Sequence, residues 1–227
     1  MTRIELAIFD LDGVLTSTTY EHFHAWELLF LKHFGIDIDP TLEKYTKGVS
    51  RVESFNVISQ YYGININDSE KEVLMDEKNA KYLKLIQNFN SSKCIAGSVH
   101  MLDYLKSKNV KIALGSASKN GELLIQRIGL QHYFDYIVDP TYLASKPAPD
   151  IFRQAQLYFG LESNQCIGIE DAISGIKAIK SANMFAIGIG PENLVDADIH
   201  VETLPQITDE ILDQILEGKY ANEHRLF

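Results

Sequence analysis

Short apolar runs that alternate with helical patterns extend over most of the chain. Four runs of four or five residues, at 6–9, 110–114, 166–169 and 185–189, are too short for helices and predict strands buried on both faces. Two weaker runs lie at 136–138 and 199–201, and helical patterns occupy 98–108, 121–128, 150–159 and 208–216. Strands that alternate with helices of this length form parallel β-α-β units. We therefore expect an α/β core.

The stretch between the first and second strands has a different pattern. Residues 16–90 contain three helical segments, at 20–34, 51–62 and 69–88, and no clear strand. Ser69 precedes Glu72 by three residues, which is the spacing of a capping box, at the start of the third segment. This organisation predicts a helical cap over residues 16–90, inserted into an α/β core domain that is formed by residues 1–15 and 91–227.

The charge balance excludes some classes of partner. The 227 residues include 21 Lys and Arg against 31 Asp and Glu, which gives a net charge of −10. Because so acidic a chain repels polyanions and anionic membranes, we expect neither a nucleic-acid partner nor a membrane partner. A small anionic substrate could still be held by a few local cations. The size and charge permit a monomer, which is the state that we expect.

The two cysteines and the start of the chain indicate the compartment. Cys94 and Cys166 have no metal-binding spacing, and Cys166 lies in an apolar run that favours a buried thiol. This cysteine usage fits a reducing compartment. Acidic residues follow the first methionine too soon for a signal peptide, and no apolar run approaches the length of a membrane span. We expect a cytoplasmic protein.

Acidic residues follow two of the predicted strands, at the edge where open parallel sheets bind their ligands. Asp10 and Asp12 come directly after the strand at 6–9, with Gly13 allowing a sharp turn. Glu170 and Asp171 come directly after the strand at 166–169. A capped turn would explain either pair alone. Two pairs at separate strand ends favour a functional site.

Hydroxyl residues and one lysine follow other elements. The strand at 110–114 leads into Ser116 and further small polar residues up to 120, which is typical of a phosphate cradle at the start of a helix. Helix capping is the alternative interpretation, because Ser and Asn are ordinary helix starters. Lys146 lies in a segment stiffened by two prolines, which would position its ammonium group, although a solvated surface lysine is the simpler alternative.

Together these residues describe a site for Mg²⁺ and a phosphoryl group. Asp10, Glu170 and Asp171 offer the hard oxygen ligands that Mg²⁺ prefers. No His or Cys follows these strands, which disfavours zinc. An aspartate at the metal can attack phosphorus and form an aspartyl-phosphate, and a second aspartate two residues on can act as general acid and base.

The same residues resemble the signature of the haloacid dehalogenase superfamily of phosphotransferases. Residues 10–15 read Asp-Leu-Asp-Gly-Val-Leu, and Ser116, Lys146 and the pair Glu170-Asp171 match the other three motifs in order. The resemblance covers nearly the whole chain and implies a Rossmann-like, doubly wound parallel sheet with an all-helical type-1 cap. The signature often continues to an aspartate where this chain has Ser17. That departure affects only what is expected of the linker between the domains.

Three longer strings, at 47–51, 117–121 and 144–152, resemble the β-phosphoglucomutase family. By this resemblance Asp10 is the nucleophile and Asp12 is the acid and base. Ser116 and Lys146 would hold the transferring phosphoryl group, a task of positioning and charge neutralisation. The implied Mg²⁺ ligands are Asp10, Asp12 through its backbone carbonyl, Glu170 and Asp171.

The resemblance also assigns residues to substrate binding. They are His22, Gly48, Val49, Arg51 and Lys78 in the cap, and Ser118, Lys119 and Asn120 in the core. Arg51 would grip the phosphate that is not transferred, a bidentate task that suits a guanidinium. Simpler alternatives stand beside these roles: His22 would share a polar helix face with His24, Arg51 would lie on the surface, and Lys78 would be solvated.

The activity implied is the interconversion of β-D-glucose 1-phosphate and β-D-glucose 6-phosphate, through phospho-Asp10 and a glucose 1,6-bisphosphate intermediate. Closure of the cap would exclude water during the transfer. The alternative is a Mg²⁺-dependent sugar-phosphate phosphatase with the same nucleophile. The motifs do not separate these two, because the difference is whether water reaches the aspartyl-phosphate. A catalytically idle binding protein is disfavoured, since every chemical position is filled.

Overall fold

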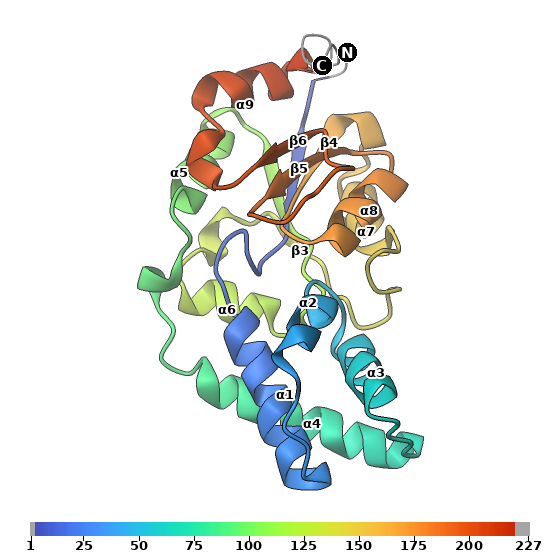
Figure 1. Cartoon of the computed structure of the whole chain (residues 1–227). Helices are drawn as coiled ribbons and strands as arrows, with labels where there is room; N and C mark the ends of the chain where they lie inside the picture. Colours follow the sequence, from blue (N-terminus) through green and yellow to red (C-terminus); the bar gives the residue numbers. More distant parts are fainter. Residues whose placement is uncertain (1–2, 221–227) are drawn as a thin grey trace.

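A computed structural model describes residues 3–220, and within them six parallel strands form a single sheet (Figure 1). The strands are β1 (Leu6–Phe9), β2 (Lys111–Leu114), β3 (Tyr136–Ile137), β4 (Cys166–Glu170), β5 (Phe185–Ile189) and β6 (Ile199–Val201). Their order in the sheet is β3-β2-β1-β4-β5-β6, and every neighbouring pair is parallel. All six apolar runs of the sequence therefore form strands, within a residue of their predicted bounds.

Helices cover both faces of this sheet, as Figure 1 shows. One face carries α5 (Ser98–Ser107), α6 (Gly121–Arg127) and α9 (Asp209–Leu216), and the other carries α7 (Asp150–Phe159) and α8 (Ile173–Ser181). Successive residues of β1 point to opposite faces, so Phe9 packs in the first hydrophobic cluster and Ile8 in the second. Both are fully buried, which explains why the strands are apolar throughout. The predicted doubly wound α/β fold is confirmed.

Four helices follow β1 in the chain, and no strand of the sheet lies between them. They are α1 (Thr19–Phe34), α2 (Glu43–Thr46), α3 (Arg51–Tyr61) and α4 (Asp68–Leu85). The helices α1, α3 and α4 share a hydrophobic cluster of their own, in which Trp26 packs against Phe30 and Phe55. Figure 1 places these helices at one end of the molecule, with α9 at the other end. We refer to residues 16–90 as the cap; these bounds stay a prediction.

The two segments that join the cap to the sheet run side by side. Thr16 and Cys94 form an isolated antiparallel bridge, and the N–H of Ile95 donates to the carbonyl of Leu15 at 2.9 Å. The hydroxyl of Thr16 donates to the carbonyl of Lys93 at 2.8 Å. Ser17, where the family signature often has aspartate, is exposed at this crossing. Thr16, which is buried and precedes Ser17, therefore anchors the linker instead.

The start of α4 differs from its prediction. The N-cap is Asn67, whose side chain accepts a hydrogen bond from the N–H of Glu70 at 2.9 Å, while the carboxylate of Glu70 accepts one from the N–H of Asn67 at 3.1 Å. The capping box predicted at Ser69 and Glu72 is wrong, because Ser69 already lies in the first turn. The sequence has both spacings, and only the backbone selects between them. Short 3₁₀ segments, which the pattern did not predict, occupy Pro40–Leu42, Ser91–Lys93, Gln131–Tyr133, Ser163–Gln165 and Leu204–Gln206.

Both cysteines are free thiols. Cys166 is fully buried in β4, which confirms the predicted core thiol, and burial raises the pKa of Cys166 to about 12. Cys94 is half-buried beside the linker. Within residues 3–220, no helix combines the length and the apolar character that a membrane span requires.

Candidate active site

The site is built where three neighbouring strands end. The strand β1 lies between β2 and β4, and the chain moves from β1 to one side of the sheet before it crosses to the other. Ligands bind at such a switch point in open α/β sheets. Asp10 follows β1, Ser116 follows β2 by two residues, and Glu170 ends β4. The N–H of Asp10 donates to the carbonyl of Ile169 at 2.9 Å, which fixes these ends side by side.

Three carboxylates meet at this edge. Asp10, Glu170 and Asp171 are all buried, and one carboxylate oxygen of each lies within 4.8 Å of the others. Two glycines make room for them. A Cβ on Gly13, whose φ is +82°, would lie 1.6 Å from Asp171 Oδ2, and a Cβ on Gly175 would lie 1.8 Å from Glu170 Oε1. Side chains at these two positions would displace the carboxylates.

Lys146 holds two of the three carboxylates. Its Nζ, which is fully buried, lies 2.5 Å from Asp10 Oδ1 and 2.7 Å from Glu170 Oε1. Burial by itself would lower the pKa of Lys146, but Asp10 and Glu170 outweigh it and raise that pKa above its ordinary value. Lys146 is therefore an ammonium ion, and the alternative of a solvated surface lysine is wrong.

The cluster has more negative than positive charge. Burial raises the pKa of Asp10, of Glu170 and of Asp171, because the lysines that pair with these three buried carboxylates do not offset the loss of solvation. A divalent cation would supply the missing charge, and the donors are oxygens of the kind that hard cations prefer. These residues therefore fit a metal ion. The backbone carbonyl of Asp12 as a further ligand stays a prediction.

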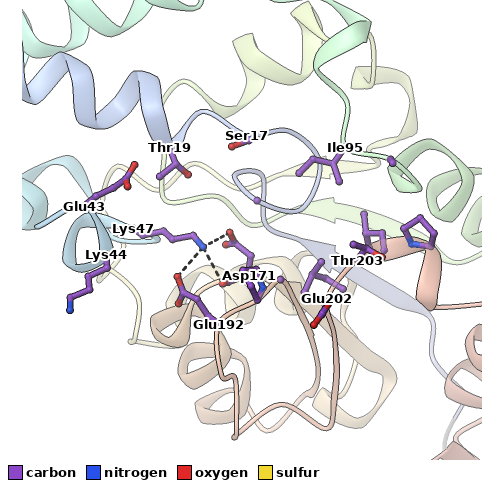
Figure 2. Close-up of a pocket in the computed structure, with 17 residues that line it drawn as sticks. Ser17, Thr19, Glu43, Lys44, Lys47, Ile95, Asp171, Glu192, Glu202 and Thr203 are labelled. Atoms are coloured by element: carbon purple, nitrogen blue, oxygen red, sulfur yellow. Dashed lines mark hydrogen bonds and ion pairs between the residues drawn. The ribbon is translucent and has the colours of Figure 1, made fainter. Parts of the chain in front are cut away.

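A second lysine reaches the same cluster from the cap. Lys47 Nζ lies 2.9 Å from Asp171 Oδ2 and 3.2 Å from Glu192 Oε1 (Figure 2). A cavity of about 550 Å³ opens beside this contact, lined by the cap on one side and, on the other, by Gly13, residues 95–96 and the segments that follow β4, β5 and β6. Lys47 was not singled out in the sequence, although it begins the cap string at 47–51.

Asp12 points away from the carboxylate cluster. Its Oδ1 accepts hydrogen bonds from the backbone N–H of Thr18, at 2.8 Å, and from the Thr18 hydroxyl. Burial raises the pKa of Asp12 more than these hydrogen bonds lower it. His22 Nε2 lies 3.9 Å from Asp12 Oδ2. A carboxyl group with a raised pKa is suited to exchanging a proton with a substrate oxygen.

Lys78, which is buried, and His22, which is half-buried, form a pair in the cap. Lys78 Nζ lies 2.7 Å from His22 Nδ1, and it lies over the rings of Trp26 and Tyr82, at 4.9 and 5.2 Å from their centroids. Burial, and then the positive charge of Arg51, lower the pKa of Lys78 to about 7. Burial, and then Lys78, place the pKa of His22 well below its ordinary range.

This pairing decides two alternatives left open by the sequence. Lys78 is 1% exposed, so the interpretation of a solvated lysine is wrong. His24 does not share a face with His22: it lies 2.9 Å from Glu27 Oε2 and stacks on Tyr20. The interpretation of a common polar face is therefore wrong as well.

Arg51 and Asn120 meet through a residue that the sequence analysis missed. Arg51 Nη2 and Asn120 Nδ2 both donate to the side-chain oxygen of Asn79, each at 2.8 Å. Arg51 Nη1 also donates to the carbonyl of Met75 at 3.3 Å. Arg51 and Asn79 belong to the cap, whereas Asn120 follows β2 in the core. No motif marks Asn79; only its place next to Lys78 in the sequence could have drawn attention to it.

The hydroxyl residues after β2 order the turn into α6. Ser116 is buried, and its Oγ accepts a hydrogen bond from the N–H of Ser118 at 3.1 Å. The Oγ of Ser118 accepts one from the N–H of Asn120 at 3.3 Å. Asn120 is the N-cap of α6, but its side chain makes no capping hydrogen bond. Lys119 is exposed. The capping alternative is therefore wrong for Asn120.

The cap string at 47–51 lies against the core. Gly48 has φ of +70°, and a Cβ there would lie 2.8 Å from the Cβ of Ala172 and 2.9 Å from Ser174 Oγ. The N–H of Ser50 donates to Ser145 Oγ at 3.0 Å. Val49, between these contacts, is half-buried. Glycine at position 48 thus allows the cap to approach the loop that follows the acidic pair.

The doubly wound sheet, the acidic strand ends and the buried lysine define a phosphoryl-transfer class of protein, and comparisons with known proteins agree. The family model for haloacid dehalogenase-like hydrolases matches residues 4–183. The chain is 38% identical over 215 residues to the β-phosphoglucomutase of Bacillus subtilis strain 168, which covers 93% of this chain and 95% of that protein. The chain therefore belongs to the haloacid dehalogenase-like hydrolase family and, within it, to the β-phosphoglucomutases.

Other relatives show how broad the likeness is. A crystal structure of β-phosphoglucomutase from Clostridium difficile has a TM-score of 0.90 at 39% identity, and the match covers 95% of this chain and 98% of that one. The fructose-1-phosphate phosphatase of Escherichia coli strain K12 is 28% identical over 187 residues, which cover 80% of this chain and 94% of the phosphatase. Mutases and phosphatases thus both occur among the relatives.

Proposed function

We propose that this protein is a Mg²⁺-dependent phosphomutase that interconverts β-D-glucose 1-phosphate and β-D-glucose 6-phosphate. One observation carries the proposal: hydrogen-bond donors suited to an anion lie in two places, one at the strand ends and one between the cap and the core. Ser116 and Lys146 lie at the strand ends beside Asp10, and Arg51 and Asn120 meet across the boundary between cap and core. A bisphosphate intermediate needs two such places, whereas hydrolysis of a monophosphate needs only one.

Asp10 is the group that exchanges the phosphoryl. In one half-reaction the 6-hydroxyl oxygen of β-glucose 1-phosphate attacks phosphorus of phospho-Asp10, the bond from phosphorus to the Asp10 oxygen breaks, and Asp12 accepts the hydroxyl proton. The product is glucose 1,6-bisphosphate. The bisphosphate then reorients, so that its phosphate at position 1 faces Asp10. The Asp10 carboxylate attacks the phosphorus at position 1, and Asp12 returns the proton to the departing sugar oxygen. Glucose 6-phosphate leaves, and phospho-Asp10 is restored.

The other strand-end residues stabilise charge during both transfers. Lys146 donates a hydrogen bond to Asp10 and would stay near the three equatorial oxygens of the transferring group. The hydroxyl of Ser116 would donate a hydrogen bond to the same oxygens. Mg²⁺ held by Asp10, the Asp12 carbonyl, Glu170 and Asp171 would neutralise charge on the phosphoryl oxygens. Glu170 holds Lys146 and is itself held by the N–H groups of Asp171 and Ala172, both at 2.8 Å.

The cap would let a sugar hydroxyl, and not water, reach the aspartyl-phosphate. Its string at 47–51 contacts the core at Lys47 and Ser50, and Asn79 joins it to Asn120. In this closed arrangement Arg51, Ser118, Lys119 and Asn120 would hold the second phosphate, while His22, Gly48, Val49 and Lys78 would surround the sugar and the Asp12 carboxyl group. Exclusion of water then protects the aspartyl-phosphate until a sugar hydroxyl reaches it. We place this reaction in the cytoplasm, which suits the two free thiols.

The first test follows both products in one tube. The protein is incubated with Mg²⁺, β-glucose 1-phosphate and a trace of glucose 1,6-bisphosphate, and glucose 6-phosphate and free phosphate are measured together. Glucose 6-phosphate without matching phosphate release is expected. Free phosphate without glucose 6-phosphate would overturn the proposal and favour a sugar-phosphate phosphatase.

Two variants assign the roles. Asp10→Asn should abolish both products, because the amide cannot accept the phosphoryl group; activity that survives it would rule out this nucleophile. Arg51→Ala should raise KM for glucose 1-phosphate by about tenfold or more and leave hydrolysis of an aryl phosphate nearly unchanged. Equal losses with both substrates would contradict a role for Arg51 at the second phosphate.

A further inference from the structure

Asn79 connects Arg51 of the cap with Asn120 of the core. Its Oδ1 accepts hydrogen bonds from Arg51 Nη2 and Asn120 Nδ2, each at 2.8 Å. Asn79 lies on α4 and Arg51 begins α3, so both belong to the cap, whereas Asn120 precedes α6 in the core. One acceptor atom therefore holds the two donors within a few ångströms of each other, with the cap against the core.

The donors retain free hydrogen-bonding capacity. A guanidinium has five N–H groups, and Arg51 uses one on Nη2 for Asn79 and one on Nη1 for the Met75 carbonyl. Within residues 3–220 its remaining N–H groups have no hydrogen-bond acceptor, and neither has the second N–H of Asn120 Nδ2. A single anion placed beside Asn79 could accept from both side chains.

The guanidinium beside Asn79 is not paired with a carboxylate. Arg51 forms no ion pair within the described part of the chain. Burial lowers the pKa of Arg51 more than the field of Asp76 raises it, and Arg51 in turn lowers the pKa of Lys78. The acceptor that faces Arg51 is nevertheless a neutral amide. An aspartate of the same shape would make the same two hydrogen bonds and cancel the charge.

We propose that Asn79 is a positioning residue that sets Arg51 and Asn120 as one anion-binding pair, and that its neutrality reserves the charge of Arg51 for the substrate phosphate that is not transferred. This inference rests on the proposed function, in which the intermediate carries a second phosphate. Asn79 acts through Arg51 and Asn120 and takes no part in the transfer at Asp10.

The test uses Asn79→Asp, which keeps the shape and adds one negative charge. In an Asp10→Asn background, which binds without turnover, the Kd of glucose 1,6-bisphosphate is measured by calorimetry. We expect Asn79→Asp to weaken it by about tenfold or more. In the active protein, KM for glucose 1-phosphate should rise by a similar factor with kcat within about threefold, and hydrolysis of p-nitrophenyl phosphate should be unchanged.

The matched control is Asn56→Asp, which adds the same charge to the exposed side of α3, where Asn56 accepts a hydrogen bond from Lys71. Its Kd for the bisphosphate should stay within about twofold of the parent. A change below about threefold for Asn79→Asp, or equal changes in Asn79→Asp and Asn56→Asp, would overturn the inference.

A second variant keeps the test decisive if Asn79→Asp does not fold, as judged by the fluorescence of Trp26, the only tryptophan. Asn79→Ala removes the shared acceptor and should weaken bisphosphate binding at least about threefold; unchanged binding would refute the positioning role. The proposed function is tested separately: it fails if the unsubstituted protein releases phosphate and forms no glucose 6-phosphate. The ratio of the bisphosphate Kd values would still report on Asn79 in that case.

Discussion

Replacing Lys78 by methionine should change how the stability of the protein depends on pH. Lys78 Nζ is enclosed by His22, Trp26 and Tyr82, and burial is the main reason why its pKa falls from 10.5 to about 7. In the unfolded chain the same amine is in water and keeps its ordinary pKa. Between pH 7 and 10.5 the unfolded chain therefore binds a proton that the folded protein has released.

The sign and size of the effect follow from this difference. Because the unfolded state binds more protons, the free energy of unfolding of the parent rises with pH in this range, by up to about 1.4 kcal/mol per pH unit. From pH 7 to pH 9 the two pKa values give a gain of about 2 kcal/mol. The Lys78→Met variant lacks this titration. The parent should therefore gain about 2 kcal/mol relative to the variant over that interval.

Urea unfolding at pH 7, 8 and 9 measures this difference, with Trp26 fluorescence as the signal and EDTA present. The thiols and other titrating groups are common to both proteins and cancel in the comparison. Lys84→Met is the control, because it removes an exposed amine from the same helix. The free energies of unfolding of Lys78→Met and the parent, plotted against pH, should diverge. Plots that stay parallel within about 0.5 kcal/mol would refute the reasoning and show that Lys78 stays charged when buried.

Three further outcomes test the strand-end cluster. Lys146→Met should lower the free energy of unfolding by about 3–5 kcal/mol in urea, because Asp10 and Glu170 would be buried without their cation; a loss below about 1 kcal/mol would contradict that pairing. Gly13→Ala should reduce phosphoryl transfer by about 100-fold with an unchanged circular dichroism spectrum, since its Cβ would collide with Asp171, and transfer within about threefold of the parent would count against this. Mg²⁺ at about 100 times its Kd should stabilise the parent by about 2.7 kcal/mol, seen as a higher Tm, and Asp171→Asn should lose most of that rise; equal rises would place the ion elsewhere.

The core of the fold could be predicted from the sequence because its signal is local. Strands such as β1 and β4 are apolar on both faces, and the residues that end them are read directly from the chain. Asp10, Ser116 and Glu170 lie at the ends of separate strands, and the rule that parallel strands present their carboxyl ends at one edge brings them together. The tight site at the switch point therefore follows from the pattern. Lys146 needed the family motif in addition, because a lone lysine carries no local signal.

The cap residues could not be placed in this way. Lys78 lies in a helix with a weak apolar pattern, and it is buried only because α1 and α4 pack with His22, Trp26 and Tyr82 around it. Asn79 has no motif, and its two donors are 28 and 41 residues away in the sequence. The capping box was misplaced by two residues, because two spacings in the sequence satisfy the same rule.

The sequence by itself determined the alternation of strands and helices and the chemistry available at the strand ends, because both depend on the order of residues along the chain. The tertiary structure decided which cations are buried, which amide joins cap to core, and that Lys47 reaches Asp171. These properties depend on distances between segments far apart in the chain. Electrostatic and hydrogen-bond energies change steeply with such distances and with burial, and packing alone sets both.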